Sequence, residues 1–201
     1  MPLADARLNR EQGSLLQLNE SQILQYRCLG WLSTADLPGV KIPALRVIAT
    51  QEIEFDRIIF ATSSGGTQAG MIVGAALFQF SGIIQGISVD LPVIDLSAHI
   101  SALAMETAEF LGHRLKIQPD EIVVEDGYLG DGYAVMTNVE KEAINLFAQQ
   151  EGILLDPVYT GRAAGGMIDL IKQGKIPPDE RILFWHTGGT PALFAYGDVL
   201  V

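Results

Sequence analysis

Hydroxyl and glycine residues gather in one short segment of the chain, at Ser63, Ser64, Gly65, Gly66 and Thr67. Glycines let a backbone curl so that several N–H groups point at one spot. A helix that starts there adds partial positive charge, and the hydroxyls of Ser64 and Thr67 are further donors. The segment therefore predicts an anion site that suits a phosphate monoester, whereas a plain strand-to-helix turn is the alternative.

A dinucleotide-binding loop is a second alternative at the same place. Asp90 ends the next apolar run, at about the 20-residue separation expected of a ribose-binding acid. However, the middle glycine of the dinucleotide fingerprint, counted from Gly65, falls at Thr67. The loop also lacks the Gly-Lys-Ser/Thr of a P-loop. A phosphate monoester is therefore the better fit.

A tyrosine and a threonine follow a proline at the start of another predicted helix, at Tyr159 and Thr160. The proline and the helix start would hold both side chains rigidly. A tyrosine in such a place acts as an acid or base if its pKa is lowered, or as a hydrogen-bond donor. A packed tyrosine with a satisfied hydroxyl is the structural alternative, and it is the commoner one in general.

A third polar segment begins at His186 and Thr187 and continues with two glycines, at the end of an apolar run. A hydroxyl at the carboxyl end of a strand can meet the flat edge of a ligand ring. His186 could act as a base, although a lone histidine at a strand end is more often a hydrogen-bonded packing residue. His99 and His113 have no acid–nucleophile set nearby, and we interpret both as structural.

Apolar runs alternate with helical patterns along the chain, which predicts an α/β fold with a parallel sheet and helices on both faces. In such a sheet ligands bind outside the carboxyl ends of the strands, so segments 63–70, 125–133 and 186–189 should converge on one site. The expected strands are 57–62, 83–89, 121–124 and 181–185. The expected helices are 22–28, 44–54, 67–80, 95–111, 139–150, 161–173 and 191–196, with Asp95 and Ser97 as caps of the fourth.

The composition excludes several classes of partner. A net charge of -11 repels phosphate backbones and anionic lipid, so we expect no nucleic-acid and no membrane partner. One cysteine, Cys28, and three histidines argue against a disulfide or a zinc site. The chain has no apolar stretch of about 20 residues and no signal-peptide pattern near its start, and we expect a cytoplasmic protein.

The three segments together resemble one family, that of D-cysteine desulfhydrase and 1-aminocyclopropane-1-carboxylate deaminase. Residues 63–70 are similar to its phosphate-binding loop, residues 152–163 to its Asp-Pro-Val-Tyr-Thr-Gly motif, and residues 186–196 to its C-terminus. The resemblance covers residues 56–196. It implies a pyridoxal phosphate (PLP) enzyme of fold type II, of which this chain is the C-terminal, large-domain half.

The resemblance also implies roles for single residues. Ser63, Ser64, Gly65, Gly66 and Thr67 would bind the cofactor phosphate, Thr187 would lie near the pyridine nitrogen with Thr160 supporting it, and Tyr159 and Tyr133 would be the catalytic tyrosines. The deaminases usually have glutamate after the catalytic tyrosine. Thr160 in that position favours the desulfhydrase branch, which eliminates sulfide from D-cysteine. Alanine at 134, where the family has glycine, weakens the assignment of Tyr133.

The lysine that forms a Schiff base with PLP in this family is not found in its usual Gly-Asn-Lys context. The chain's lysines are Lys41, Lys116, Lys141, Lys172 and Lys175. We therefore expect residues 1–54 to be an unrecognised N-terminal segment, residues 55–201 to be the PLP-binding domain, and the chain to be a truncated one without activity of its own. A sheet that lacks partner strands also predicts association into oligomers. A non-catalytic phosphate-binding relative is the alternative function.

Overall fold

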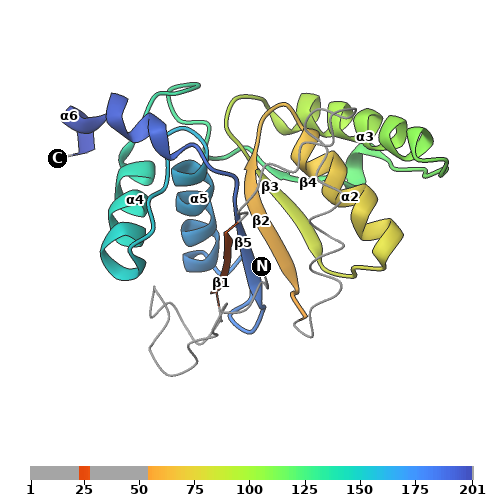
Figure 1. The fold of residues 1–201 in the computed structure, drawn as a ribbon, viewed down its shortest axis with the longest axis horizontal. Coiled ribbons are helices and arrows are strands. Elements are labelled where there is room, and N and C mark those ends of the chain that lie inside the picture. Colours follow the sequence, from red (N-terminus) through yellow and green to blue (C-terminus); the bar gives the residue numbers. More distant parts are fainter. Residues whose placement is uncertain (1–22, 28–53, 201) are drawn as a thin grey trace, which may run out of the picture.

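A computed structural model describes residues 23–27 and 54–200. Five parallel strands form its central sheet, in the order β1-β5-β2-β3-β4 (Figure 1). The strands are β1 (Ile23–Arg27), β2 (Arg57–Thr62), β3 (Ile83–Ser88), β4 (Val123–Glu125) and β5 (Ile182–His186). The expected parallel α/β fold is confirmed.

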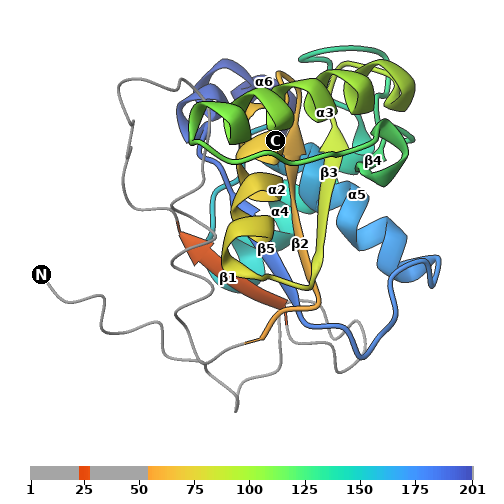
Figure 2. The ribbon, with the colours of Figure 1, turned by 90° about the vertical axis from the view of Figure 1, so that its right-hand side faces the viewer.

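Both faces of the sheet are buried, which explains why β2 and β5 are almost continuously apolar. Ile59 and Phe184 face one core with helices α4 (Asn138–Glu151) and α5 (Thr160–Lys172). Ile58 and Leu183, one residue earlier on each strand, face the other core with α2 (Gly66–Phe78). Helix α3 (Val93–Phe110) packs outside α2, as Figure 2 shows from the side. Three short helices complete the described part of the chain: η1 (Pro119–Glu121), η2 (Thr190–Ala195) and α6 (Gly197–Leu200).

The order in which the chain adds strands to the sheet reverses between β2 and β5, which are neighbours in its middle. From β2 the chain proceeds outward to β3 and then to β4, and afterwards it returns to β5 on the other side of β2. The loops that follow β2 and β5 therefore leave the sheet in opposite directions and open a crevice between them. Ligands of open α/β sheets bind at such a switch point.

Two local predictions are wrong. Residues 23–27 form an edge strand that pairs with β5, not a helix; a helix of that length has too few internal hydrogen bonds to form without packing, whereas an open strand edge offers backbone partners. Helix α3 has no side-chain cap from Asp95 or Ser97. Instead Asp126, from a distant loop, accepts a hydrogen bond from Val93 N at 2.8 Å.

The expected helix 44–54 lies almost wholly outside the described residues. The other expected elements are present with ends shifted by a few residues, except that 191–196 is a 3₁₀ helix and Pro119–Glu121 turns once before β4 begins. Within the described ranges, no helix is long and apolar enough to cross a membrane.

Candidate functional site

A cleft of about 490 Å³ lies at the switch point between β2 and β5. It brings together the loop after β2, the loop after β5 and the start of α5. Tyr133, from the glycine-rich loop before α4, reaches the same place because its hydroxyl hydrogen bonds to that of Tyr159. The expected convergence of segments 63–70, 125–133 and 186–189 is confirmed. The residues lining the cleft are Ala61, Thr62, Ser63, Ser64, Gly65, Thr67, Tyr159, Thr187, Gly188 and Gly189.

The loop after β2 presents the start of α2 to this cleft. Gly65 is the N-cap residue, with φ at 75°, and no side chain of the loop caps the helix. The first N–H groups of α2 have no acceptor within the helix and are free to bind an anion. Gly65 also packs against α3, where a Cβ would come within 2.8 Å of Ile100 Cγ1. Both the positive φ and this contact require glycine.

The hydroxyl groups of the loop differ in what they bind. Ser63 Oγ donates to Asp90 Oδ2 at 2.6 Å, so the carboxylate that a dinucleotide site would use for ribose is engaged with the loop itself. Ser64 and Thr67 line the cleft. The buried Thr62 Oγ1, also on the cleft wall, has no hydrogen-bond partner among the described residues, which is a reason to expect a ligand there.

His99 has a positional role in the same loop. Its Nε2 lies 3.1 Å from Ser64 O. Its ring also packs beside Gly65, since a Cβ added to Gly65 would lie 3.3 Å from His99 Cδ2. By donating to that carbonyl from α3, His99 fixes the position of the loop before α2. The structural interpretation of His99 agrees with this contact.

Tyr133 meets Tyr159, which lines the cleft, edge to face. Their ring centroids are 6.0 Å apart at 72°, and the two hydroxyls are hydrogen bonded. This bond with Tyr133, together with burial and the nearby carboxylates of Asp156 and Asp90, raises the pKa of Tyr159 to about 12. At neutral pH Tyr159 is therefore a phenol that can donate a hydrogen bond, and in this arrangement it is a poor base.

Asp156 is the residue that positions Tyr159, and its role was not predicted. The carboxylate is fully buried and accepts hydrogen bonds from the N–H groups of Val158, Tyr159 and Thr160 at 2.7–2.9 Å. Two of these donors lie in the turn before α5 and the third is its first residue, so Asp156 holds the turn that leads into this helix. An aspartate directly before a proline favours the start of a turn, and this signal could have identified it.

The same carboxylate joins the two walls of the cleft. A Cβ on Gly189 would lie 2.7 Å from Asp156 Cγ, so the loop after β5 packs directly on this side chain. Thr160 is fully buried and its hydroxyl donates to Asp156 at 2.7 Å. Thr160 thus stands behind the cleft, while Thr187 lines it. His186 uses both ring nitrogens, one with Leu154 O and one with Gly188 N, as a packing residue would.

A buried ion pair lies behind the glycine-rich loop that holds Tyr133. Arg162 Nε donates to Glu140 Oε1 at 2.5 Å, and both side chains are almost fully buried. Burial alone would raise the pKa of Glu140, but hydrogen bonds from Thr137 and Arg162 outweigh it and hold the pKa below its ordinary value. Glu140 also completes a capping box with Thr137 at the start of α4.

The lowered pKa of Glu140 predicts a pH dependence of folding. Its contribution to the free energy of unfolding is present above the ordinary glutamate pKa of about 4.3 and is lost as the pH falls through the lowered value. We expect Glu140→Gln to be less stable at neutral pH but to lose less stability on acidification than the unchanged protein. Urea unfolding over a pH series tests this. Glu142→Gln, at an exposed position of the same helix, is the control, and an equally flattened slope there would refute the assignment.

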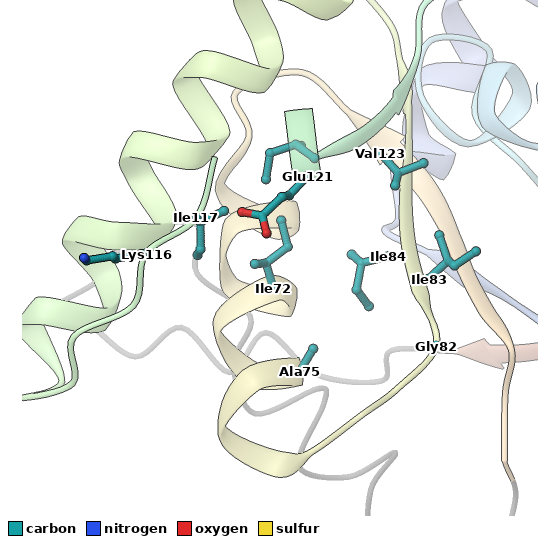
Figure 3. Close-up of a pocket in the computed structure, with 10 residues that line it drawn as sticks. Ile72, Ala75, Gly82, Ile83, Ile84, Lys116, Ile117, Glu121 and Val123 are labelled. Carbon is teal, nitrogen blue, oxygen red and sulfur yellow. The ribbon is translucent and has the colours of Figure 1, made fainter. Parts of the chain in front are cut away.

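A second cavity, of about 360 Å³, lies between α2 and the β3–β4 edge of the sheet (Figure 3). Its walls are mainly aliphatic side chains from α2, β3 and the segment before β4. Glu121 is one of its two charged residues, and its carboxylate accepts a hydrogen bond from Gln118 N. No set of donors converges there, so the cleft between β2 and β5 is the better candidate for chemistry.

Comparison with known proteins agrees with the resemblance that the three motifs showed. Residues 39–188 match the family described as pyridoxal-phosphate dependent enzymes. A 1-aminocyclopropane-1-carboxylate deaminase from Burkholderia ambifaria is 36% identical over 76% of this chain and 46% of its own length. A D-cysteine desulfhydrase from Klebsiella pneumoniae is 40% identical over 72% of this chain and 43% of its own. The resemblance stated from the motifs is confirmed.

Solved structures place the fold in the same group. A crystal structure described as an ACC deaminase homologue superposes with a TM-score of 0.71 and 37% identity, over 79% of this chain and 47% of that one. The fold is thus that of the type II enzymes of pyridoxal phosphate. The chain spans about half the length of the relatives that it matches.

Proposed function

The chain belongs to the family of pyridoxal-phosphate-dependent enzymes, and from this premise we propose that its cleft binds PLP for an elimination or deamination of a small amino acid. The observation that carries the proposal is the anion cradle after β2. It joins an uncapped helix start, two hydroxyls and the unpartnered Thr62 Oγ1 in one wall. These neutral donors suit a phosphate dianion, which needs several hydrogen bonds at once.

The other walls fit the rest of the cofactor. Thr187 on the opposite wall offers a neutral hydroxyl to a ring edge, and such a partner leaves a pyridine nitrogen largely unprotonated. When bound, PLP would supply an electron sink for the α-carbon of the substrate. Tyr159 would hold a proton at its hydroxyl oxygen, where the raised pKa keeps it, and would donate a hydrogen bond to a reacting group.

The proposed substrate is D-cysteine or a related small amino acid. Thr160, where deaminases of the family usually have glutamate, supports the desulfhydrase branch, in which β-elimination gives pyruvate, sulfide and ammonia. Thr160 directs its hydroxyl to Asp156. A glutamate at that position would bring a second carboxylate against Asp156, so this chain favours a neutral side chain there.

No lysine lines the cleft among the described residues. Lys141 Nζ donates to Val199 O, and Lys116 lies at the second cavity, whereas Lys41 falls outside the described residues. We therefore propose that these residues hold PLP through its phosphate and ring and do not turn over substrate by themselves. A non-catalytic relative that binds a phosphorylated ligand is the second candidate function, and the lysine-free cleft favours it.

Calorimetric titration with PLP, and with pyridoxal as the matched ligand without phosphate, tests the proposal. PLP should bind at least about ten times more tightly, because each charge-assisted hydrogen bond to phosphate contributes about 1.5–3 kcal/mol. Thr67→Val should weaken PLP binding about tenfold. Thr107→Val, which removes a buried hydroxyl bonded only within α3, should leave it unchanged.

Two results would count against these assignments. Equal affinities for PLP and pyridoxal, or no binding of either, would refute the phosphate cradle. A new absorption band at about 410–430 nm on adding PLP would show a covalent bond to a lysine and would refute binding without one.

A further inference from the structure

Arg162 is the largest fully buried side chain of the described protein. It lies on α5 one turn after Tyr159, and its guanidinium is surrounded by acceptors from three other parts of the chain. It donates to Val89 O beyond the end of β3 at 2.8 Å, to Gly132 O at 3.2 Å and to Val135 O at 2.8 Å. With Glu140 as the fourth acceptor, each of the three guanidinium nitrogens donates at least one hydrogen bond.

Two of these acceptors flank Tyr133 on both sides. The backbone around this residue is strained, since Gly132 has φ at 129° and Ala134, which has a side chain, has φ at 61°. A left-handed conformation costs roughly 1–2 kcal/mol for a residue with a Cβ. Hydrogen bonds from outside the loop must therefore hold this backbone conformation. Arg162 donates them to the carbonyls of Gly132 and Val135, and Tyr196 donates one to Ala134 O at 2.6 Å.

The side chain of Tyr133 has little packing of its own to fix it, because 52% of its surface is exposed. Its position against Tyr159 follows from the backbone on either side. Glu140 holds the end of the same loop. Its Oε2, the carboxylate oxygen that Arg162 does not bind, accepts hydrogen bonds from the N–H and the hydroxyl of Thr137. Arg162 thus connects α5, which follows directly after Tyr159, to the loop that carries Tyr133.

We propose that the buried Arg162–Glu140 pair is a positioning device that sets the hydroxyl contact between Tyr133 and Tyr159. Neither residue of the pair lines the cleft, and both act through the backbone of the glycine-rich loop. The inference deepens the proposed function, since it concerns the tyrosines of the same site. Its test requires no cofactor, so a failure to bind PLP would leave it standing.

The test is a titration of Tyr159 by NMR, with ¹³C at Cζ of tyrosine and resonances assigned by Tyr→Phe variants. The hydrogen bond with Tyr133 is the largest cause of the raised pKa of Tyr159, so Tyr133→Phe should lower it by roughly one pH unit. The double variant Arg162→Met with Glu140→Gln should lower it to the same value. Glutamine keeps the capping box and no unpaired charge is left buried.

Arg57 and Glu180 provide a matched control. They form a similar ion pair at 2.6 Å with little exposure, at the amino end of β2 and far from the cleft. Arg57→Met with Glu180→Gln should cost comparable stability and leave the pKa of Tyr159 unchanged. Adding Tyr133→Phe to the Arg162 and Glu140 changes should produce no further shift.

Three outcomes would overturn the proposal. In the first, the pKa of Tyr159 stays at its original value in the Arg162 and Glu140 double variant. In the second, this pKa falls equally in the Arg57 and Glu180 control. In the third, Tyr133→Phe lowers the pKa further when it is added to the double variant. If the double variant does not fold, Arg162→Lys serves in its place. Lysine keeps the charge beside Glu140 but cannot reach both loop carbonyls with one fork, and it should lower the pKa in the same direction.

Discussion

Gly65→Ala is expected to weaken the binding of PLP about 100-fold or more. Gly65 has φ at 75°, and an added Cβ would lie 2.8 Å from Ile100 Cγ1 and 3.3 Å from His99 Cδ2. Either the loop or α3 must move, and the N–H groups at the start of α2 move with the loop. A displacement of about 1 Å in a binding constellation can cost a factor of about 100. Calorimetric titration with PLP and with inorganic phosphate measures the loss.

Gly174→Ala is the matched control for this substitution. Gly174 has φ at 68° at the end of α5, and nothing lies within 4 Å of an added Cβ. The variant therefore bears the same left-handed strain, roughly 1–2 kcal/mol, without any crowding at the cleft. It should be less stable and bind PLP normally. Unchanged binding in Gly65→Ala, or an equal loss in Gly174→Ala, would contradict the assignment of the cradle to Gly65.

Asp156→Ala should lower the free energy of unfolding by about 3–5 kcal/mol, which is a large part of the stability of a domain. The change leaves the N–H groups of Val158, Tyr159 and Thr160 without an acceptor at a buried helix start. It also opens a gap against Gly189. Urea unfolding monitored by circular dichroism gives the loss in stability.

Graded variants separate the hydrogen bonds of Asp156 from its general packing. Asp156→Asn keeps the shape but turns an NH₂ group toward backbone donors, so its loss should lie between those of alanine and the unchanged protein. Thr160→Val removes one donor to the carboxylate and the acceptor of Asp156 N, and should cost about 1–2 kcal/mol. A loss below about 0.5 kcal/mol in Asp156→Ala would show that the carboxylate does not hold this turn.

Local sequence patterns were sufficient to predict four of the five described strands and the edge of the sheet at which the candidate site lies. Residues 58–61 are apolar throughout because β2 is covered on both faces, and that burial is visible in the chain itself. The loop Ser63–Thr67 was recognisable because glycine and hydroxyl residues stand together between a strand and a helix. Parallel strands end at one edge, so the convergence with Thr187 followed from topology alone.

The supporting residues could not be found in this way. Arg162 receives its function from Glu140 and from carbonyls as far away as Val89. The strand Ile23–Arg27 exists because β5 leaves an edge open for it. Contacts of this kind join residues many positions apart, and no local pattern records them.

The chemistry of Tyr159 shows the same division. The chain determined that a tyrosine stands at a helix start within a fold of the pyridoxal-phosphate enzymes, because a proline, a threonine and a glycine surround it in a recognisable motif. Whether it is an acid, a base or a donor was decided by Tyr133, Asp156 and burial. A pKa depends on the charges and hydrogen bonds within a few ångströms, and only the folded chain brings those groups together.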